Sequence, residues 1–254
     1  MAHFPDCVAR NSTGCSQVVA ANQRRCCLND SRIHTRINEG LLGPLERPIL
    51  KWLAVHSPKW MNPDIYTTIG IAGSAIAFIG YLLSRYHPVY LWLATLGFIV
   101  NWIGDSMDGT LARFRHIERP IYGYFIDHIT DSITAVLLFL GMGLSPYISF
   151  NVASLALVGF LLMSVLVYLR TYVDGEFRLS YAMLAPTEAR ALAVLLNTAM
   201  FFFGKQLWHL YFPLLGNPGI NPYDLFVGVI ALLMLYFFLT TAYKESIRLA
   251  KTPQ

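Results

Sequence analysis

Residues 104–132 read GDSMDGTLARFRHIERPIYGYFIDHITDS and contain four aspartates, Asp105, Asp108, Asp127 and Asp131. Each pair of aspartates lies at the end of a long apolar run, where a bare carboxylate is costly if the run crosses a lipid bilayer. On a helix, the first pair is spaced i, i+3 and the second pair i, i+4, so the members of each pair share one face. We therefore expect the four acids to converge if the two helices face each other.

Four carboxylates at one place repel one another, and burial disfavours their charged forms. Divalent cations would supply the compensating charge, and a ligand set of oxygens alone points to Mg²⁺ or Mn²⁺ rather than zinc. The small residues Gly109, Ala112 and Gly123 lie on the same faces and would open a seam for a backbone or a ligand. Two bridged ions suit displacement at a phosphoryl centre. The plain alternative is that these acids are helix-end residues in loops.

The spacing Asp-x2-Asp-Gly-x2-Ala-Arg, nine residues, then Gly-x3-Asp-x3-Asp is present in full. Its eight positions are Asp105, Asp108, Gly109, Ala112, Arg113, Gly123, Asp127 and Asp131. This pattern resembles the signature of the CDP-alcohol phosphotransferases (CDP-alcohol phosphatidyltransferases), the integral membrane enzymes that make phospholipid head-group linkages. The resemblance extends from about residue 62 to the last apolar run. It implies transfer of a substituted phosphate from a CDP-linked donor to an alcohol hydroxyl, with release of CMP.

The resemblance also implies roles for the acids. Asp105, Asp108 and Asp127 would hold two divalent cations, Mg²⁺ or Mn²⁺, and Asp131 would complete the metal site and take the proton of the acceptor hydroxyl. His128 is the other candidate for this base, because the choline- and ethanolamine-phosphotransferase branch of the family also reads Asp-His here. A packed histidine is the alternative interpretation of His128.

The implied CDP-binding residues are Gly109, Ala112, Arg113, Gly123, Asn62 and Thr67. Gly109 and Ala112 would let the cytidine approach. The planar fork of Arg113 suits the donor phosphates, although an arginine at a membrane boundary also snorkels to the interface. Asn62 and Thr67 align loosely with an Asn and a Thr that help to hold the cytidine in the family. An Asx turn or a helix cap explains Asn62 equally well.

A second polar island follows the fourth apolar run, and its candidate acceptor-binding residues are Arg170, Tyr172, Glu188 and Arg190. Its Thr-Tyr-x2-Gly and Pro-x-Glu spacings resemble the choline and ethanolamine branch. The arginines could equally cradle an anionic acceptor such as an inositol phosphate. Pro186 and Glu188 also suit the first turn of a helix, which is the structural alternative.

The composition is that of a polytopic membrane protein, with 55% hydrophobic and 13% charged residues. Six apolar runs are long enough to span a bilayer. They are residues 65–83, 89–108, 121–144, 152–172, 188–203 and 223–243. The predicted fold is an all-α integral membrane bundle of six transmembrane helices, preceded by an amphipathic juxtamembrane helix.

Four regions follow from this pattern. Residues 1–32 are polar and aperiodic, which predicts a disordered cytosolic tail. Residues 33–61 form an amphipathic interfacial region, residues 62–243 the six-helix catalytic domain, and residues 244–254 a cytosolic C-terminal tail.

In the amphipathic region, an apolar stripe that includes Ile49 and Leu50 has Glu46 and Lys51 facing away from it, and Trp52 is one of the expected interfacial anchors. Docking of this helix on the protein itself is the alternative to a position along the membrane surface.

The distribution of basic residues predicts the orientation. With a cytosolic N-terminus, only Arg85 and Lys205 of the 19 lysines and arginines fall on the outer side. The positive-inside rule therefore places both termini and the four aspartates on the cytosolic side. The net charge of +4 fits attraction to anionic membrane lipids and donors, and no nucleic-acid partner is predicted.

The donor and the assembly stay open at this level. CDP-diacylglycerol with a small polar alcohol is slightly favoured, because the chain is short, over CDP-choline or CDP-ethanolamine with diacylglycerol. Dimers are common in the family, so a homodimer is considered, although no dimer seam is readable. A cation- or proton-coupled transporter is the alternative of a different class, but its path needs polar residues on both sides of the midplane, and here they gather at one end.

Overall fold

The computed structural model of the 254-residue chain describes residues 42–174, 186–207 and 221–251. This described part is entirely helical and contains no strand. Its helices are α2 (Gly43–His56), α3 (Pro63–Leu83), α4 (Tyr90–Phe114), α5 (Pro120–Leu144), α6 (Phe150–Asp174), α7 (Pro186–Leu207) and α8 (Pro222–Ala250). The predicted tail at residues 1–32 lies outside the described residues.

The six apolar runs expected from the sequence coincide with α3 to α8. Among the described helices, α3, α5, α6 and α8 are long and apolar enough to cross a membrane. α4 and α7 are of similar length, with 25 and 22 residues, but they carry charged residues such as Asp105 and Arg190. The four apolar helices support an integral membrane protein.

Prolines mark where several helices begin. Pro63, Pro120, Pro186 and Pro222 are the first residues of α3, α5, α7 and α8. Proline suits this position because the first helical N–H has no partner within the helix and the proline ring fixes a helical φ. The expected role of Pro186 in the first turn of a helix is therefore confirmed.

α3 and α4 pack against each other through glycines. A Cβ atom added at Gly73, Gly97 or Gly104 would overlap backbone atoms of the facing helix, so only glycine permits this spacing. In contrast, no atom of the described residues lies within 4 Å of a Cβ at Gly123, and the three atoms nearest to a Cβ at Gly109 belong to the Arg113 side chain. The small residues that permit a close helix–helix approach thus lie between α3 and α4, and an opening for a ligand at Gly109, Ala112 and Gly123 stays a prediction.

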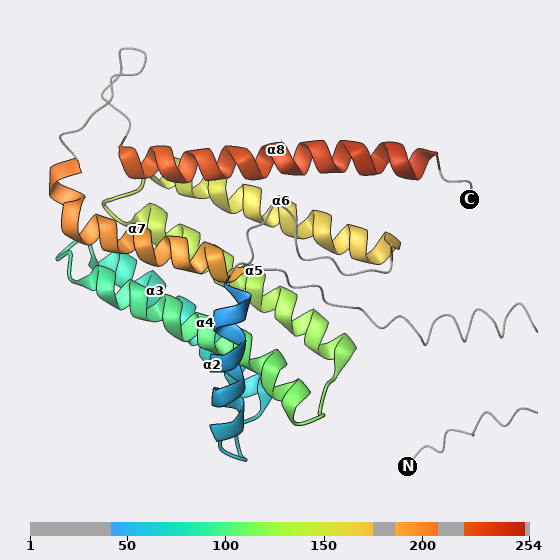
Figure 1. The fold of residues 1–254 in the computed structure, drawn as a ribbon. Coiled ribbons are helices and arrows are strands. Elements are labelled where there is room, and N and C mark those ends of the chain that lie inside the picture. Colours follow the sequence, from blue (N-terminus) through green and yellow to red (C-terminus); the bar gives the residue numbers. More distant parts are fainter. Residues whose placement is uncertain (1–41, 175–185, 208–220, 252–254) are drawn as a thin grey trace, which may run out of the picture.

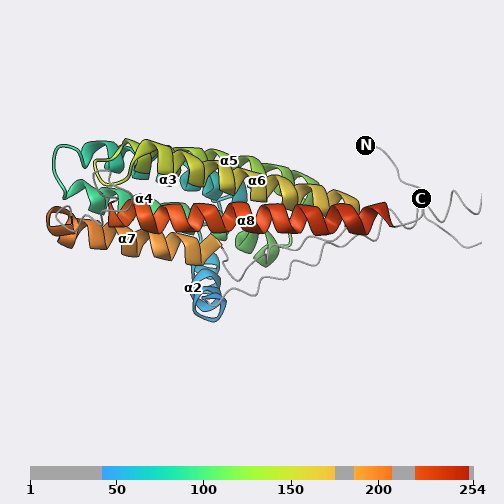
Figure 2. The same ribbon diagram turned by 90° about the horizontal axis from the view of Figure 1, so that it is seen from above.

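α3 is the common support of these two helices, since both α4 and α5 pack against it. α6 packs against α5 and α8, and α7 packs against α4. Figures 1 and 2 show these six helices running side by side, with α2 lying crosswise to them. Because the chain turns back between Phe114 and Pro120, the aspartates of α4 and α5 lie near the same end of the bundle.

α2 docks on the bundle through one face. Leu50 and Ala54 are buried against residues of α3 and α4, including Met107. Ile49 and Trp52 are 49% and 60% exposed, so the expected apolar stripe is divided between a docked face and an exposed face. Glu46 was expected to face away but points toward α4 and α7, because polar side chains there bind its carboxylate.

Candidate functional site

The two carboxylates of α4 are held by donors from three helices. Both Asp105 and Asp108 are partly buried. The Thr67 hydroxyl of α3 donates to Asp108 Oδ2 at 2.8 Å, and the Gly109 N–H donates to Asp108 Oδ1 at 2.5 Å. Arg190 Nη2 of α7 donates to Asp105 Oδ2 at 2.7 Å. Their orientations are therefore set by tertiary contacts.

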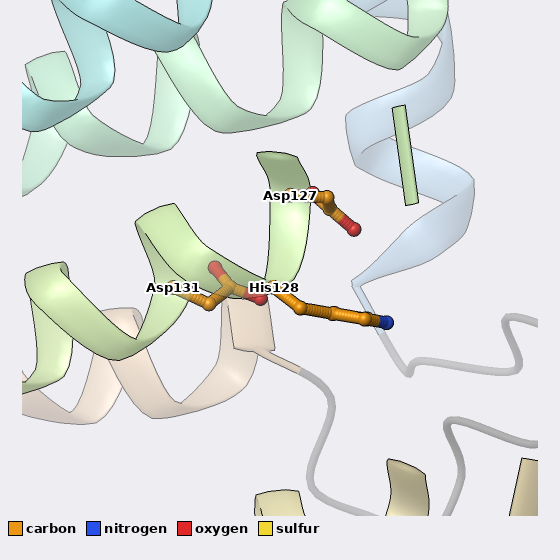
Figure 3. Close-up of side chains that lie close together, drawn as sticks. All are labelled: Asp127, His128 and Asp131. Atoms are coloured by element: carbon orange, nitrogen blue, oxygen red, sulfur yellow. The ribbon is translucent and has the colours of Figure 1, made fainter. Parts of the chain in front are cut away.

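The acids of α5 form a group with a histidine. Within the described residues, Asp127, His128 and Asp131 are the one group of three side chains that could hold a metal ion (Figure 3). Each offers one ligand atom, and these atoms lie within 4.8 Å of one another. This separation is short enough for one cation to bridge them after small side-chain movements.

The two pairs of acids belong to one charged cluster. Asp108 interacts electrostatically with Asp105 and Asp127, and Arg190 interacts with both Asp105 and Asp131. However, Asp105 and Asp108 lie outside the close group on α5. The reason is architectural: α4 and α5 each pack against α3, and in the described part of the chain they do not pack closely on each other.

The donor set fits a hard divalent cation. Carboxylate oxygens, which Asp127 and Asp131 offer, are ligands that Mg²⁺ and Mn²⁺ prefer. Asp108 of α4 lies close enough to Asp127 and Asp105 for their charges to interact. His128 adds an imidazole nitrogen to this group. The cluster can therefore bind a metal ion by the chemistry of its own residues.

His128 is both part of this group and packed. Its side chain is buried, and its ring lies 4.1 Å from the Tyr124 ring and 4.5 Å from the Tyr168 ring, measured between centroids. The packing agrees with the structural alternative for His128, while the proximity of Asp127 and Asp131 agrees with a role in the site.

Two of the predicted nucleotide-binding residues, Thr67 and Gly109, contact Asp108 of α4. Thr67 contacts Asp108 directly, and Gly109 lies under the Arg113 guanidinium, whose Nη1 would be 3.2 Å from a Cβ at Gly109. Arg113 is exposed, Ala112 is partly buried, and Gly123 faces open space. Asn62 is exposed at the N-cap position of α3, but its side chain makes no capping hydrogen bond.

The predicted acceptor-binding residues have separate partners. Arg170 pairs with Glu245 of α8 at 2.7 Å, whereas Arg190 pairs with Asp105. Glu188 is buried, and its Oε1 accepts the Leu42 N–H at 3.1 Å. The side chain of Tyr172 lies outside what the structure describes.

Sequence reasoning missed two residues that support the site. Asn101 of α4 is buried and accepts a hydrogen bond from Arg190 Nε at 3.0 Å while its amide donates to Gly70 O at 2.9 Å. Glu46 accepts hydrogen bonds from Trp102, Ser106 and Thr187. Asn101 lies one helical turn before Asp105, a signal that could have been used, but nothing local distinguishes Glu46 from a solvated acid.

Two arginines, Arg115 and Arg119, connect loop and helix-end residues at this end of the bundle. Arg115 Nη2 donates to Pro58 O at 2.9 Å, and Arg119 pairs with Asp64 at 2.5 Å. The hydrogen bond to Asp64 raises the pKa of Arg119 above its ordinary value. The side chains of Arg119 and Asp64 are about half exposed, at 51% and 49%, so water and salt screen the attraction between them.

Comparison with known proteins agrees with this geometry. Residues 60–247 match the family described as CDP-alcohol phosphatidyltransferase. Cholinephosphotransferase 1 from Mus musculus is 27% identical over 204 residues, which cover 77% of this chain and 50% of that protein. The protein of the same name from Homo sapiens is 26% identical over 183 residues, covering 69% of this chain and 44% of its own length. The chain thus spans about half the length of these relatives.

A solved structure shares the fold. Phosphatidylinositol phosphate synthase from Mycobacterium tuberculosis, crystallised with CDP-DAG bound, aligns with a TM-score of 0.51 and 17% identity, covering 77% of this chain and 90% of that chain. The fold and the carboxylate cluster define an all-helical membrane protein with a candidate metal site. Since the family match covers most of the sequence, the chain belongs to the CDP-alcohol phosphatidyltransferase family.

Proposed function

We propose that this protein transfers a substituted phosphate from a CDP-linked donor to the hydroxyl of an alcohol and releases CMP. The observation that carries the proposal is the cluster of Asp105, Asp108, Asp127 and Asp131 at one end of a membrane bundle. Carboxylates gathered near a membrane surface are suited to bind a cation and, through it, a diphosphate.

In this proposal, Asp105, Asp108 and Asp127 hold two divalent cations, Mg²⁺ or Mn²⁺, and Asp131 completes the set. When bound, the cations neutralise the diphosphate and polarise the reacting phosphoryl group. Asp131 accepts the proton of the acceptor hydroxyl, with His128 as the other candidate for this base. The acceptor oxygen forms a bond to phosphorus as the bond between phosphorus and the CMP oxygen breaks.

The nucleotide would lie against α4 and the start of α5. Gly109 and Ala112 leave room for the cytidine, Arg113 would offset phosphate charge, and Gly123 faces open space. Thr67 already orients Asp108, because its hydroxyl donates to Asp108 Oδ2. Asn62 is exposed at the N-cap position of α3 and would contact the base.

Gly123→Ala tests this placement. The change should raise the free energy of unfolding by about 0.5–1 kcal/mol, because alanine is the better helix former and its methyl meets no neighbour. The KM for the donor should rise severalfold because the methyl intrudes on the nucleotide. Thermal unfolding and donor-dependent CMP release measure the two effects. An unchanged KM in the more stable variant would remove Gly123 from the nucleotide site.

The acceptor would approach from the side of α6 and α7, where Arg170, Tyr172, Glu188 and Arg190 lie. Glu188 supports this because its buried Oε2 has no hydrogen-bond partner among the residues that the structure describes, so a bound hydroxyl or ammonium group would satisfy it. Arg170 and Arg190 are engaged in ion pairs and would have to exchange partners to bind an anionic acceptor.

Two donor classes are candidates. The sequence slightly favours CDP-diacylglycerol with a polar alcohol, and the structural neighbour solved with CDP-DAG supports room for such a donor in this fold. The cholinephosphotransferase relatives, together with the Asp127-His128 pair, support the second candidate, CDP-choline or CDP-ethanolamine with diacylglycerol.

A donor panel separates these candidates. Purified protein in lipid with Mn²⁺ or Mg²⁺ is offered CDP-diacylglycerol with a set of alcohols, or CDP-choline or CDP-ethanolamine with diacylglycerol, and CMP release is measured. We expect release with one donor class and none without metal. Silence with every donor from folded, metal-binding protein would contradict the proposed reaction and favour a transporter.

The membrane arrangement proposed is six spans, α3 to α8, with α2 along the cytosolic interface and both termini cytosolic. The crosswise course of α2 and its exposed Trp52 support the interfacial position. In this arrangement residues 1–32 and 244–254 are cytosolic tails and residues 62–243 the catalytic domain. A homodimer in the membrane is compatible with it.

A further inference from the structure

The ion pair between Arg190 and Asp105 joins the start of α7 to the aspartate cluster. Both side chains are largely buried, with 13% and 22% of their surfaces exposed, and the pair is 2.7 Å long. Arg190 Nε also donates to Asn101 Oδ1 at 3.0 Å. The guanidinium therefore donates hydrogen bonds to two residues of α4 that are one helical turn apart. These contacts fix both the position and the rotation of the Asp105 carboxylate.

Hydrogen bonds made by Thr187 and Glu188, which precede Arg190 in α7, help to hold Arg190 in position. Thr187 Oγ1 donates to Glu46 Oε2 at 3.0 Å, and Glu46 Oε1 accepts from Ser106 of α4 at 2.9 Å. Glu188 accepts the Leu42 N–H at the start of α2. The first turn of α7 is thus tied to α2 and α4 immediately before the residue that reaches Asp105.

The negative charges of the aspartate cluster explain why a buried arginine at position 190 would stabilise the fold. Asp105, Asp108, Asp127 and Asp131 lie within electrostatic reach of one another or of Arg190. Without a cation in their midst these acids would repel each other and push α4 away from its neighbours. Arg190 interacts with Asp105 from α4 and with Asp131 from α5, so a single buried cation offsets charge on both aspartate-bearing helices.

We propose that Arg190 is a positioning residue that acts as the built-in counter-cation of the aspartate cluster, holding Asp105 in place while no metal is bound instead of contacting the acceptor. The inference rests on the proposed metal-dependent function. It assigns to Arg190 a role distinct from that of Arg170, the other arginine of the same polar island, whose ion pair joins α6 to α8.

The first test is a double-mutant cycle in metal-free protein, using Arg190→Met, Asp105→Asn and both together, with thermal unfolding as the readout. Each single change leaves a buried charge without its partner and should lower the Tm by about 5 °C or more. The double variant should lose less Tm than the sum of the two single losses, because neither Arg190 nor Asp105 is then left without the other. Additive losses would overturn the proposal, since they are what independent packing roles predict.

The second test adds Mn²⁺ to the same proteins. Mn²⁺ should raise the Tm of Arg190→Met by more than that of the wild type, because the ion supplies the missing positive charge. Arg190→Lys should regain part of the metal-free stability but not all, since an ammonium cannot grip Asn101 and Asp105 together. An equal Mn²⁺ shift in wild type and Arg190→Met would contradict the role toward the metal.

Glu245→Gln is the matched control. It removes the acid from another interhelical arginine pair of the same length, 2.7 Å, whose glutamate is 16% exposed. Its effect on the Tm should be the same with and without Mn²⁺. The Tm values of the double-mutant cycle are measured without donor or metal. Additive losses of Tm would count against the role of Arg190, whereas absence of CMP release by the wild type would count against the transferase proposal, so the two failures are distinguishable.

Discussion

Asp108→Asn is expected to lower CMP release by about 100-fold or more, because it removes a charge on which phosphoryl transfer depends. The substitution keeps the size of the side chain, and its amide oxygen can still accept the Thr67 hydroxyl that binds Asp108 Oδ2 at 2.8 Å. The loss should therefore appear in turnover and in the stabilisation that Mn²⁺ gives, while the fold is retained. CMP release and thermal unfolding with and without Mn²⁺ measure these effects.

The control for this prediction is Asp224→Asn. Asp224 lies in the first turn of α8, where its carboxylate accepts the Ser149 N–H at 2.7 Å. The same isosteric change there should leave CMP release within about twofold of wild type, because it is remote from the proposed site. Full activity in Asp108→Asn with unaltered Mn²⁺ binding would exclude Asp108 as a metal ligand.

Gly104→Ala is expected to lower the free energy of unfolding by about 3 kcal/mol or more, which corresponds to a fall in Tm of about 6–12 °C for a domain of this size. A Cβ at Gly104 would overlap the backbone of Gly70 and Tyr66 on α3. Backbone atoms cannot yield as a flexible side chain can, so the two helices must separate. Since Asp105 follows directly, CMP release should fall as well.

Gly123→Ala is the matched comparison, because the same methyl is added to a helix at a position with nothing within 4 Å. The two variants gain the same helix propensity, so the difference between their Tm values isolates the close approach of α3 and α4. Thermal unfolding in one detergent or lipid measures both. An equal rise in Tm for the two variants would mean that the α3–α4 seam tolerates a side chain.

Local sequence was enough to predict the helices and the family. Apolar run length predicted the six segments that coincide with α3 to α8, and proline predicted where α7 begins. The spacing of Asp127 and Asp131 placed both on one face of α5, because helical periodicity alone determines which residues share a face. The motif that contains them indicated the family to which the chain belongs.

The tertiary structure decided which neighbouring helix α4 and α5 pack against. The sequence left open whether α4 and α5 face each other. In the structure both pack against α3, and Gly73, Gly97 and Gly104 allow α3 and α4 to approach closely. Local periodicity cannot reveal a partner helix, since that depends on how all the surfaces fit together.

The same limit applies to single charged residues. Arg190 pairs with an acid 85 residues away and Thr187 with Glu46 at a separation of 141 residues, whereas Arg170 joins Glu245. A sequence lists these charges without saying which will be buried together. The sequence by itself thus determined the helical segments, the family and the acids of the proposed metal site. Only the packing of the helices decided which cation balances those acids, because a buried charge takes the partner that the fold brings within reach.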